Sequence, residues 1–371
     1  MTAEATGKEL PTSALACSGA GPSRAAMEGG GVYNRNSAIQ AAGGALASPL
    51  LLEAASKVPV AKDIPLVIAD FGASQGRNSL LPLRTAITIL RERAGTEKPI
   101  SVVHTDLPEN DFSTLFQLLE SDPDSYLRHQ PNVFTYAAGK SFYEPLFPHD
   151  HITLGWSSYA LMWPSQLAAL IPDHIYSTRS TGAVLDAFNK RGDEDWRRFL
   201  SLRANELRQG GRLVIVVAAR DSQGLHGLEL LMDHANAVLG DMVEEKRISA
   251  AERQRIVLPA HPKSLKDLMA PFERNGGFHG LIVEHCDVFA GPDPAWEAFR
   301  QNRDSKTLAI SRAGFFRAAF GPTFASALDN SRTSAQRVAF SDRLEQGLVS
   351  RVTKDPTEMR LVIGTMVIAK Q

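Results

Sequence analysis

The sequence of 371 residues contains only two cysteines, Cys17 and Cys286. Two cysteines cannot form a disulfide framework or a metal-ligand spacing in a chain of this size, so a reducing, cytoplasmic location is expected. The chain also lacks an excess of charge of one sign, because 40 basic and 41 acidic residues leave a net charge of −1. Phosphate binding needs a basic excess or stripe, so nucleic acid is not expected to be the main partner.

Long apolar runs are missing as well. No segment reaches the ~20 apolar residues that span a bilayer, so no membrane span is expected. Residues 1–26 contain Gly, Ser, Ala and Pro without a long apolar core. That composition argues against a signal peptide and predicts a flexible N-terminal arm. The remainder, residues 27–371, has the composition of an ordinary globular protein.

Seven apolar, β-branched runs in this remainder predict strands. They predict a doubly wound α/β sheet of seven strands, with helices at about 77–93 and 111–120. Three long segments, 157–210, 225–270 and 294–350, are mostly helical and exceed what crossovers need. We expect them to form a helical cap over the carboxyl ends of the strands, where ligands bind in such sheets. The strands are expected at 65–70, 100–106, 132–138, 151–156, 211–219, 279–289 and 358–369.

The first two strands carry the strongest functional signal. Asp70 ends the first strand and Asp106 ends the second, and Gly72 and Gly76 follow the first. Strand, glycine loop, helix, strand and acid is the order in which α/β folds hold a nucleoside. Glycines allow the backbone to approach the ligand, and the acid accepts hydrogen bonds from ribose hydroxyls. The structural alternative for either acid is a cap of the following helix.

The glycine loop alone does not identify the ligand. GASQGRN, residues 72–78, is neither G-x-G-x-x-G nor a phosphate-binding loop ending in Gly-Lys-Ser/Thr. A dehydrogenase of the Tyr-x-x-x-Lys type needs a lysine four residues after its tyrosine, but Trp163 follows Tyr159 at that distance. These patterns argue against hydride transfer.

Five ordered motifs are more specific, and together they resemble the SABATH methyltransferases. These enzymes transfer a methyl group from S-adenosylmethionine to small-molecule carboxylates. The resemblance implies a class I methyltransferase fold with a Rossmann-like sheet, and often a homodimer. The motifs are MEGG with YNRNSAIQ at 27–40, ADFGASQGRNS at 69–79, DLPENDF at 106–112, GKSFYEPLFP at 139–148 and SSYALMWPSQ at 157–166.

The resemblance also implies residue roles. Gln40 and Trp163 would grip the substrate carboxylate and are the expected catalytic residues. Tyr159, Met162 and Phe316 would line the pocket for the rest of the substrate. The residues expected to bind S-adenosylmethionine are Tyr33, Ser37, Asp70, Gly72, Asn78, Asp106, Leu107, Ser141 and Phe142.

The chain departs from the family pattern near its opening motif. Glu28 stands where members often have Lys or Asn, and Val32 replaces a usual Ser. The opening loop is also a few residues shorter, and Ala73 replaces a frequent Cys. These departures bear on the contacts between this loop and the cofactor.

The expected chemistry explains why no acid/base pair or metal is predicted. A carboxylic acid with a pKa near ~4–5 is ionised at neutral pH, and a sulfonium leaves without a proton. The enzyme therefore has to place a carboxylate oxygen in line with the methyl group. A Gln amide and a Trp N–H are neutral donors suited to this task. An Arg clamp would stabilise the ground-state anion, whose charge is lost in the transition state.

Several alternatives remain open from the sequence. Trp163 could instead be an ordinary core aromatic, and Gln40 could be a solvated helix residue. His149 and His151 would lie on one face of a strand and invite a metal, although loop and strand-edge residues are the simpler reading. The substrate is a medium-chain fatty acid or a small aromatic acid, and the stretch GLHGLELLM at 224–232 favours a fatty acid. Methylation of a xanthine-like nitrogen and a non-catalytic cofactor-binding homologue are the other functions considered.

Overall fold

The computed structural model describes residues 27–371 except 274–275, so the predicted arm at 1–26 lies outside the described residues. Its strands are β1 Leu66–Phe71, β2 Ile100–Asp106, β3 Val133–Gly139, β4 Ile152–Ser158, β5 Leu207–Ala218, β6 Leu281–Ala290 and β7 Val362–Lys370. Its helices are α1 Val32–Asn36, α2 Ala38–Ala45, α3 Ser48–Lys57, η1 Arg77–Ser79, α4 Leu80–Ala94, α5 Phe112–Ser121, α6 Tyr126–His129, η2 Ser177–Arg179, α7 Gly182–Glu206, α8 Glu229–Glu244, α9 Ala250–Arg255, α10 Leu265–Met269, α11 Pro294–Asn302, α12 Ser305–Ser326 and α13 Ser334–Lys354.

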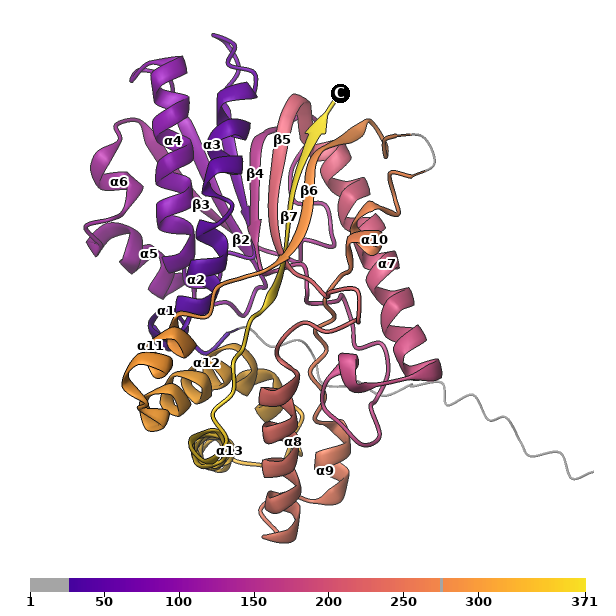
Figure 1. Ribbon diagram of the computed structural model, residues 1–371. Coiled ribbons are helices and arrows are strands. Elements are labelled where there is room, and N and C mark those ends of the chain that lie inside the picture. The colour runs from indigo at the N-terminus through magenta and orange to yellow at the C-terminus, as the bar shows by residue number, and fades with distance from the viewer. Residues whose placement is uncertain (1–26, 274–275) are drawn as a thin grey trace, which may run out of the picture.

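The strands form one seven-stranded sheet in the order β3-β2-β1-β4-β5-β7-β6. Strands β1 to β5 pair in parallel, and β7 runs antiparallel to both β5 and β6. The predicted doubly wound, seven-stranded α/β sheet is confirmed (Figure 1). β5 begins four residues before the expected 211, and its pairing with β4 shifts register between Leu207 and Arg212, a stretch that contains Gly210 and Gly211. A glycine bulge of this kind hides the start of a strand from an apolar pattern.

Alternate residues of the central strands feed two separate cores, as the period of a strand requires. In β5, Val214 and Val216 belong to the core that includes Leu83 of α4, whereas Leu213 and Ile215 belong to the other core. Figure 1 shows α3 and α4 on one face of the sheet and α7 on the opposite face.

The position of α7 corrects one expectation. Segment 157–210 was expected to belong to the cap, but α7 packs Trp196, Phe199 and Leu200 into the second core, beneath the sheet. The chain needs a helix there because both faces of a parallel sheet are apolar and must be covered.

Helices α8, α9, α11, α12 and α13 gather beyond the carboxyl ends of the parallel strands (Figure 1). Ion pairs connect them to one another. Arg317 of α12 contacts Asp342 and Glu345 of α13, each at 2.7 Å, and Arg332 contacts Glu252 of α9 at 2.7 Å. These helices form a cap whose parts pack through buried apolar side chains, such as Val238, Phe324 and Leu344, and are also linked by ion pairs.

Helices α2 and α3 lead from the N-terminal segment to the sheet. α3 buries Leu51, Ala54 and Ala55 in the first core. Within the described chain, no single helix is long and apolar enough to cross a membrane. The bent pair α2 and α3 meets that test jointly, by length and composition only.

Candidate active site

Two neighbouring cavities lie where β1, β2 and β4 end, and they share Met27, Tyr33, Tyr159 and Trp163. The first, which we call the strand-end cavity, has about 500 Å³ of free space, part of it open to solvent. The second, the cap cavity, has about 400 Å³. The strand-end cavity is further lined by Gly72, Ser74, Asp106, Leu107, Phe142, Ser158 and Ala160. The cap cavity is further lined by Gln40, Met162, His226, Leu228, Phe315, Ala319, Phe320 and Leu361.

Asp106 is the acidic group of the strand-end cavity, and backbone donors fix its orientation. The Ser74 N–H donates to Oδ2 and the Leu107 N–H donates to Oδ1, both at 2.7 Å. The N–H groups of Gly72 and Ala73 both donate to the Thr105 carbonyl, which ties the glycine loop to β2. The loop and the carboxylate are therefore built as one rigid unit.

Gly72 forms the floor of the strand-end cavity, and only glycine fits there. Its φ is +80°, and a Cβ at this position would lie 2.3 Å from the Cβ of Ala160. Glycine is the residue that adopts this conformation without strain. The sequence prediction that Gly72 brings backbone close to a ligand agrees with its position on the cavity wall.

Tyr33 and Tyr159 stand where the two cavities meet. Burial, together with the nearby Asp106 carboxylate, raises the pKa of the Tyr33 phenol above its usual value. Burial also raises the pKa of Tyr159, with a smaller contribution from Tyr33. Both phenols therefore stay protonated at neutral pH, and they can donate hydrogen bonds but cannot act as bases.

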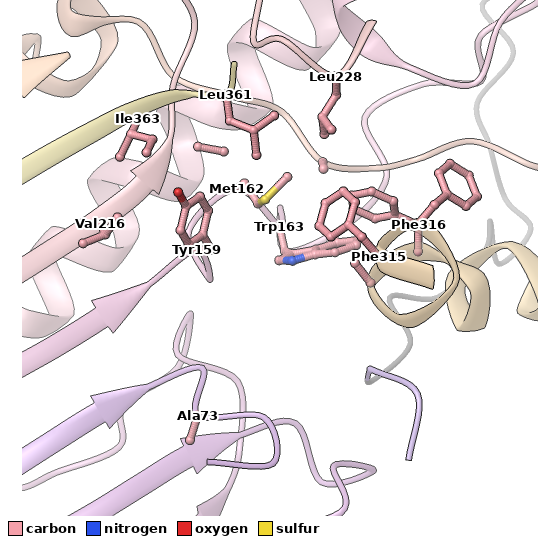
Figure 2. Close-up of a cluster of buried hydrophobic side chains, with 14 of the residues drawn as sticks. Ala73, Tyr159, Met162, Trp163, Val216, Leu228, Phe315, Phe316, Leu361 and Ile363 are labelled. Atoms are coloured by element: carbon pink, nitrogen blue, oxygen red, sulfur yellow. The ribbon is translucent and has the colours of Figure 1, made fainter. Parts of the chain in front are cut away.

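Gln40 and Trp163 approach the cap cavity from α2 and from the loop after β4. The Trp163 carbonyl accepts from the Tyr143 hydroxyl at 2.8 Å, which helps to fix the residue. Figure 2 shows the indole nitrogen on the side toward Tyr159, with Phe315 beyond the opposite end of the ring. Gln40 Oε1 and the Tyr159 hydroxyl are buried and lack a hydrogen-bond partner within the described residues. Unpaired buried polar atoms beside a cavity are what a ligand would satisfy.

The charge of the two cavities is limited to one carboxylate. Of the described residues, no Lys or Arg lines either cavity. The donors that surround the cap cavity are accordingly neutral, as the chemistry of an anionic nucleophile favours.

Asp70 does not reach either cavity. It sits opposite His104 in the β1–β2 pairing, and its Oδ2 lies 2.8 Å from His104 Nδ1. His104 Nε2 lies 2.9 Å from the Tyr126 hydroxyl, which in turn lies 3.0 Å from Thr135 Oγ1. The structure thus places Asp70 in a buried polar chain that crosses the sheet, rather than on the cavity wall.

Three more of the predicted cofactor residues are not among those that line the strand-end cavity. The Ser37 hydroxyl donates to Asn78 Oδ1 at 3.2 Å, and Asn78 is within hydrogen-bonding reach of the Tyr33 phenol. Ser141 Oγ accepts from the Tyr143 N–H at 3.3 Å. Direct contacts of Ser37, Asn78 and Ser141 with a cofactor stay predictions. Tyr33, Gly72, Asp106, Leu107 and Phe142 do line the cavity.

Phe316 is predicted to line the substrate pocket, and in the structure its neighbour Phe315, rather than Phe316, lines the cap cavity. The Phe316 ring packs on Phe320 and Phe324, each at 5.5 Å between centroids, and is 1% exposed. Phe315 faces the cap cavity because successive helical residues point about 100° apart. Tyr159, Met162, Gln40 and Trp163 also line that cavity, and their contacts with a substrate stay predictions.

Sequence reasoning missed other residues of the cap cavity. Ala319 follows Phe315 at i+4 in α12, a spacing that could have indicated a shared face, whereas the i+5 spacing of Phe320 gives no such signal. His226 and Leu361 lie in irregular segments, and no local pattern marks them. The stretch 225–228 precedes α8 rather than forming a helix.

The histidines around residue 150 show no metal-site arrangement. His149 is exposed, and the His151 ring stacks on Phe147 with 6.0 Å between centroids. Across the described residues, no group of three or more His, Cys, Asp or Glu side chains could hold a metal ion.

Comparison with known proteins places this geometry in a family. Residues 23–366 match the model of the SAM dependent carboxyl methyltransferases. The chain belongs to this family. It is 27% identical over 329 residues to gibberellic acid methyltransferase 2 of Arabidopsis thaliana, which covers 80% of the chain and 83% of that enzyme. It is 32% identical over 228 residues to the benzoic acid/salicylic acid carboxyl methyltransferase 2 of Petunia hybrida, which covers 57% of the chain and 64% of that enzyme, slightly under two thirds.

A solved structure supports the fold of this methyltransferase. Loganic acid methyltransferase with S-adenosylhomocysteine superposes with a TM-score of 0.74 and 22% identity, and the match covers 93% of this chain and 98% of that one. The expected class I methyltransferase fold is therefore confirmed.

The cofactor of this methyltransferase family is S-adenosylmethionine, and the strand-end cavity fits it. The anchored Asp106 carboxylate suits a ribose diol, the Gly72 loop admits close backbone approach, and Leu107 and Phe142 offer apolar walls for the adenine.

Proposed function

We propose that this methyltransferase esterifies the carboxylate of a small aromatic acid, giving a methyl ester and S-adenosylhomocysteine. One observation carries the proposal. The cap cavity holds neutral donors, Gln40 and Trp163, and opens onto the strand-end cavity through Tyr33 and Tyr159. A carboxylate held by these donors would lie next to a cofactor held at Asp106.

The residues around this junction position the reaction rather than exchange protons. When bound, S-adenosylmethionine supplies a sulfonium methyl group. Asp106 and the Gly72 loop would hold this group, and the methyl would pass to a carboxylate oxygen while the electron pair of the broken carbon–sulfur bond would stay on sulfur. The Gln40 amide and the Trp163 N–H would orient the oxygen without the strong pairing that Arg imposes. The buried phenols of Tyr33 and Tyr159 stay neutral and help to exclude water.

The lining of the cap cavity favours an aromatic acid. Trp163, Phe315 and Phe320 supply ring faces, and the Trp163 and Phe320 centroids are 6.1 Å apart. The stretch 224–232, which lacks aromatics, suggested a fatty acid from the sequence. The aromatic side chains of the cavity come from other segments, so the composition of 224–232 does not indicate the substrate. A medium-chain fatty acid is the alternative substrate.

The test is incubation of the full chain with methyl-labelled S-adenosylmethionine and matched panels of benzoic, indole and fatty acids. We expect labelled methyl esters, with kcat/KM higher for aromatic acids than for fatty acids of similar size. Turnover of a xanthine with no acid would instead support N-methylation. Tight cofactor binding without turnover of any panel member would support a non-catalytic homologue.

We also propose a homodimer in a reducing, cytoplasmic setting. The family resemblance supports the dimer. The presence of only two cysteines, of which Cys286 is a free thiol, supports the reducing setting. Light scattering of the purified chain would give twice 40.3 kDa for a dimer.

A further inference from the structure

His226 is the one imidazole on the wall of the cap cavity, as far as the described residues go, and the mechanism above does not use it. Its segment enters between β5 and α8. The ring is 1% exposed, in a wall that otherwise consists largely of aromatic and aliphatic carbon. A buried polar ring in such a wall is costly unless its hydrogen-bonding groups are used.

The protein fixes the orientation of this ring. Nδ1 lies 2.7 Å from the Ala219 carbonyl oxygen, and a carbonyl only accepts, so Nδ1 carries the hydrogen. The backbone is pinned on both sides. The His226 N–H donates to Glu229 Oε1 at 2.8 Å, and the His226 carbonyl accepts from the Val362 N–H at 2.7 Å.

With Nδ1 protonated, the neutral ring presents Nε2 as an acceptor. Burial lowers the pKa of His226, although the Ala219 carbonyl, the Glu229 carboxylate and the Val362 carbonyl act in the opposite direction. The net lowering favours the neutral ring. Within the described residues, no donor lies within hydrogen-bonding distance of Nε2. The Val362 carbonyl, which accepts from the Ala219 N–H at 2.9 Å, has no hydrogen to donate to Nε2.

We infer that His226 is a specificity-determining residue that accepts, through Nε2, a hydrogen bond from a hydroxyl or ring N–H of the acid substrate. This inference rests on the proposed carboxyl methylation and names a residue that would distinguish acids with a second, donor group from acids without one. Figure 2 shows Leu228 and Leu361 across from Trp163. Leu228 is two residues after His226, and Leu361 precedes Val362, whose N–H donates to the His226 carbonyl. A substrate whose carboxylate meets Trp163 would then direct its far side toward the His226 segment.

The experiment compares pairs of acids that differ only in the donor. Suitable pairs are the three hydroxybenzoates against the corresponding fluorobenzoates, and indole-3-acetate against benzothiophene-3-acetate. For at least one pair we expect the donor-bearing acid to have a kcat/KM roughly 3- to 10-fold higher, the range of one neutral hydrogen bond. No preference in any pair overturns the inference while leaving the proposed function intact, whereas no turnover of any acid overturns the proposed function itself.

Two variants of His226 separate the acceptor from the structural donor. His226→Asn keeps an N–H at the position that reaches Ala219 and removes Nε2, so we expect the pairwise preference to fall to about one. His226→Gln can place an amide oxygen near the Nε2 position and should retain part of the preference. As a control, Met162→Leu reshapes the same wall without a hydrogen-bonding group and should change both members of a pair alike. A preference that survives in His226→Asn, with unchanged affinity for S-adenosylhomocysteine showing that the variant is folded, contradicts the inference.

Discussion

The two cavities of this methyltransferase are built in different ways. The strand-end cavity is formed by strand termini, a glycine loop and a carboxylate that two backbone N–H groups hold. The cap cavity is formed by side chains from α2, the loop after β4, α12 and the segments around α8 and β7. The first is defined by backbone geometry and suits a constant cofactor. The second is defined by side chains from several helices and loops, so it can vary with the substrate without disturbing the sheet.

The largest expected effect separates chemistry from cofactor binding. Gln40 lines only the cap cavity, so Gln40→Ala should lower kcat/KM for the acid by on the order of 100-fold and leave cofactor affinity unchanged. Trp163→Phe removes the indole N–H and keeps a ring, and we expect a similar loss. Turnover assays and calorimetry with S-adenosylhomocysteine measure the two quantities. Trp296→Phe, on α11 and away from both cavities, is the control, and near-normal rates in Gln40→Ala would mean that the carboxylate is held elsewhere.

The converse change lies in the strand-end cavity. Asp106→Ala removes a charged hydrogen-bond acceptor and should weaken S-adenosylhomocysteine binding by about 1.5–3 kcal/mol, roughly 10- to 150-fold in Kd. Glu109→Ala makes the same charge change at an exposed site a few residues away and should leave Kd unaltered. Equal Kd values for both variants in calorimetry would break the assignment of Asp106 to the cofactor.

Two neighbouring glycines in α2 give a smaller, steric comparison. A Cβ on Gly43 would lie 1.9 Å from the Tyr159 hydroxyl, whereas a Cβ on Gly44 would meet nothing closer than Ser158 Oγ at 3.2 Å. Both Gly→Ala changes raise helix propensity by up to about 1 kcal/mol. We expect Gly43→Ala to be about 1–3 kcal/mol less stable than Gly44→Ala in urea unfolding, because it displaces Tyr159. It should also raise KM for the acid, and two variants of equal stability and KM would show that Tyr159 need not occupy this position.

The last comparison concerns an ion pair of the cap, where we expect a change in the free energy of unfolding and the smallest change in activity. Hydrogen bonds from Arg332, opposed by burial and aided by the N–H groups of Ser249 and Asp329, lower the pKa of Glu252 from 4.5 to about 2. A lowered folded-state pKa contributes stability that is present above pH 4.5 and is lost as the pH falls toward 2. Glu252→Gln should therefore be about 1–2 kcal/mol less stable than the wild type at pH 7. Urea unfolding should show this gap closing between pH 4.5 and 2.5, and a gap independent of pH would mean that the Glu252 charge does not hold the cap.

The same division explains what could be predicted from the sequence. Strand-end residues such as Gly72 and Asp106 follow apolar runs directly, so their position is encoded locally, and the sheet itself was predicted strand by strand. The contact of the Asp70 carboxylate with His104 could not be predicted, because pairing between strands is not visible in one segment. The packing of Phe316 on Phe320 and Phe324, away from the cap cavity, could not be predicted either, because helix phase depends on how α12 packs. Leu361 and His226 reach the cap cavity through long-range contacts that leave no local pattern.

The most direct test of the account is a crystal structure with S-adenosylhomocysteine and an aromatic acid bound together. The account predicts the ribose hydroxyls on the Asp106 carboxylate and the acid's carboxylate within hydrogen-bonding distance of the Gln40 amide and the Trp163 indole nitrogen. It also predicts that one carboxylate oxygen faces the cofactor sulfur between Tyr33 and Tyr159. An acid carboxylate paired with an Arg or Lys outside the cap cavity, or a ribose away from Asp106, would contradict it.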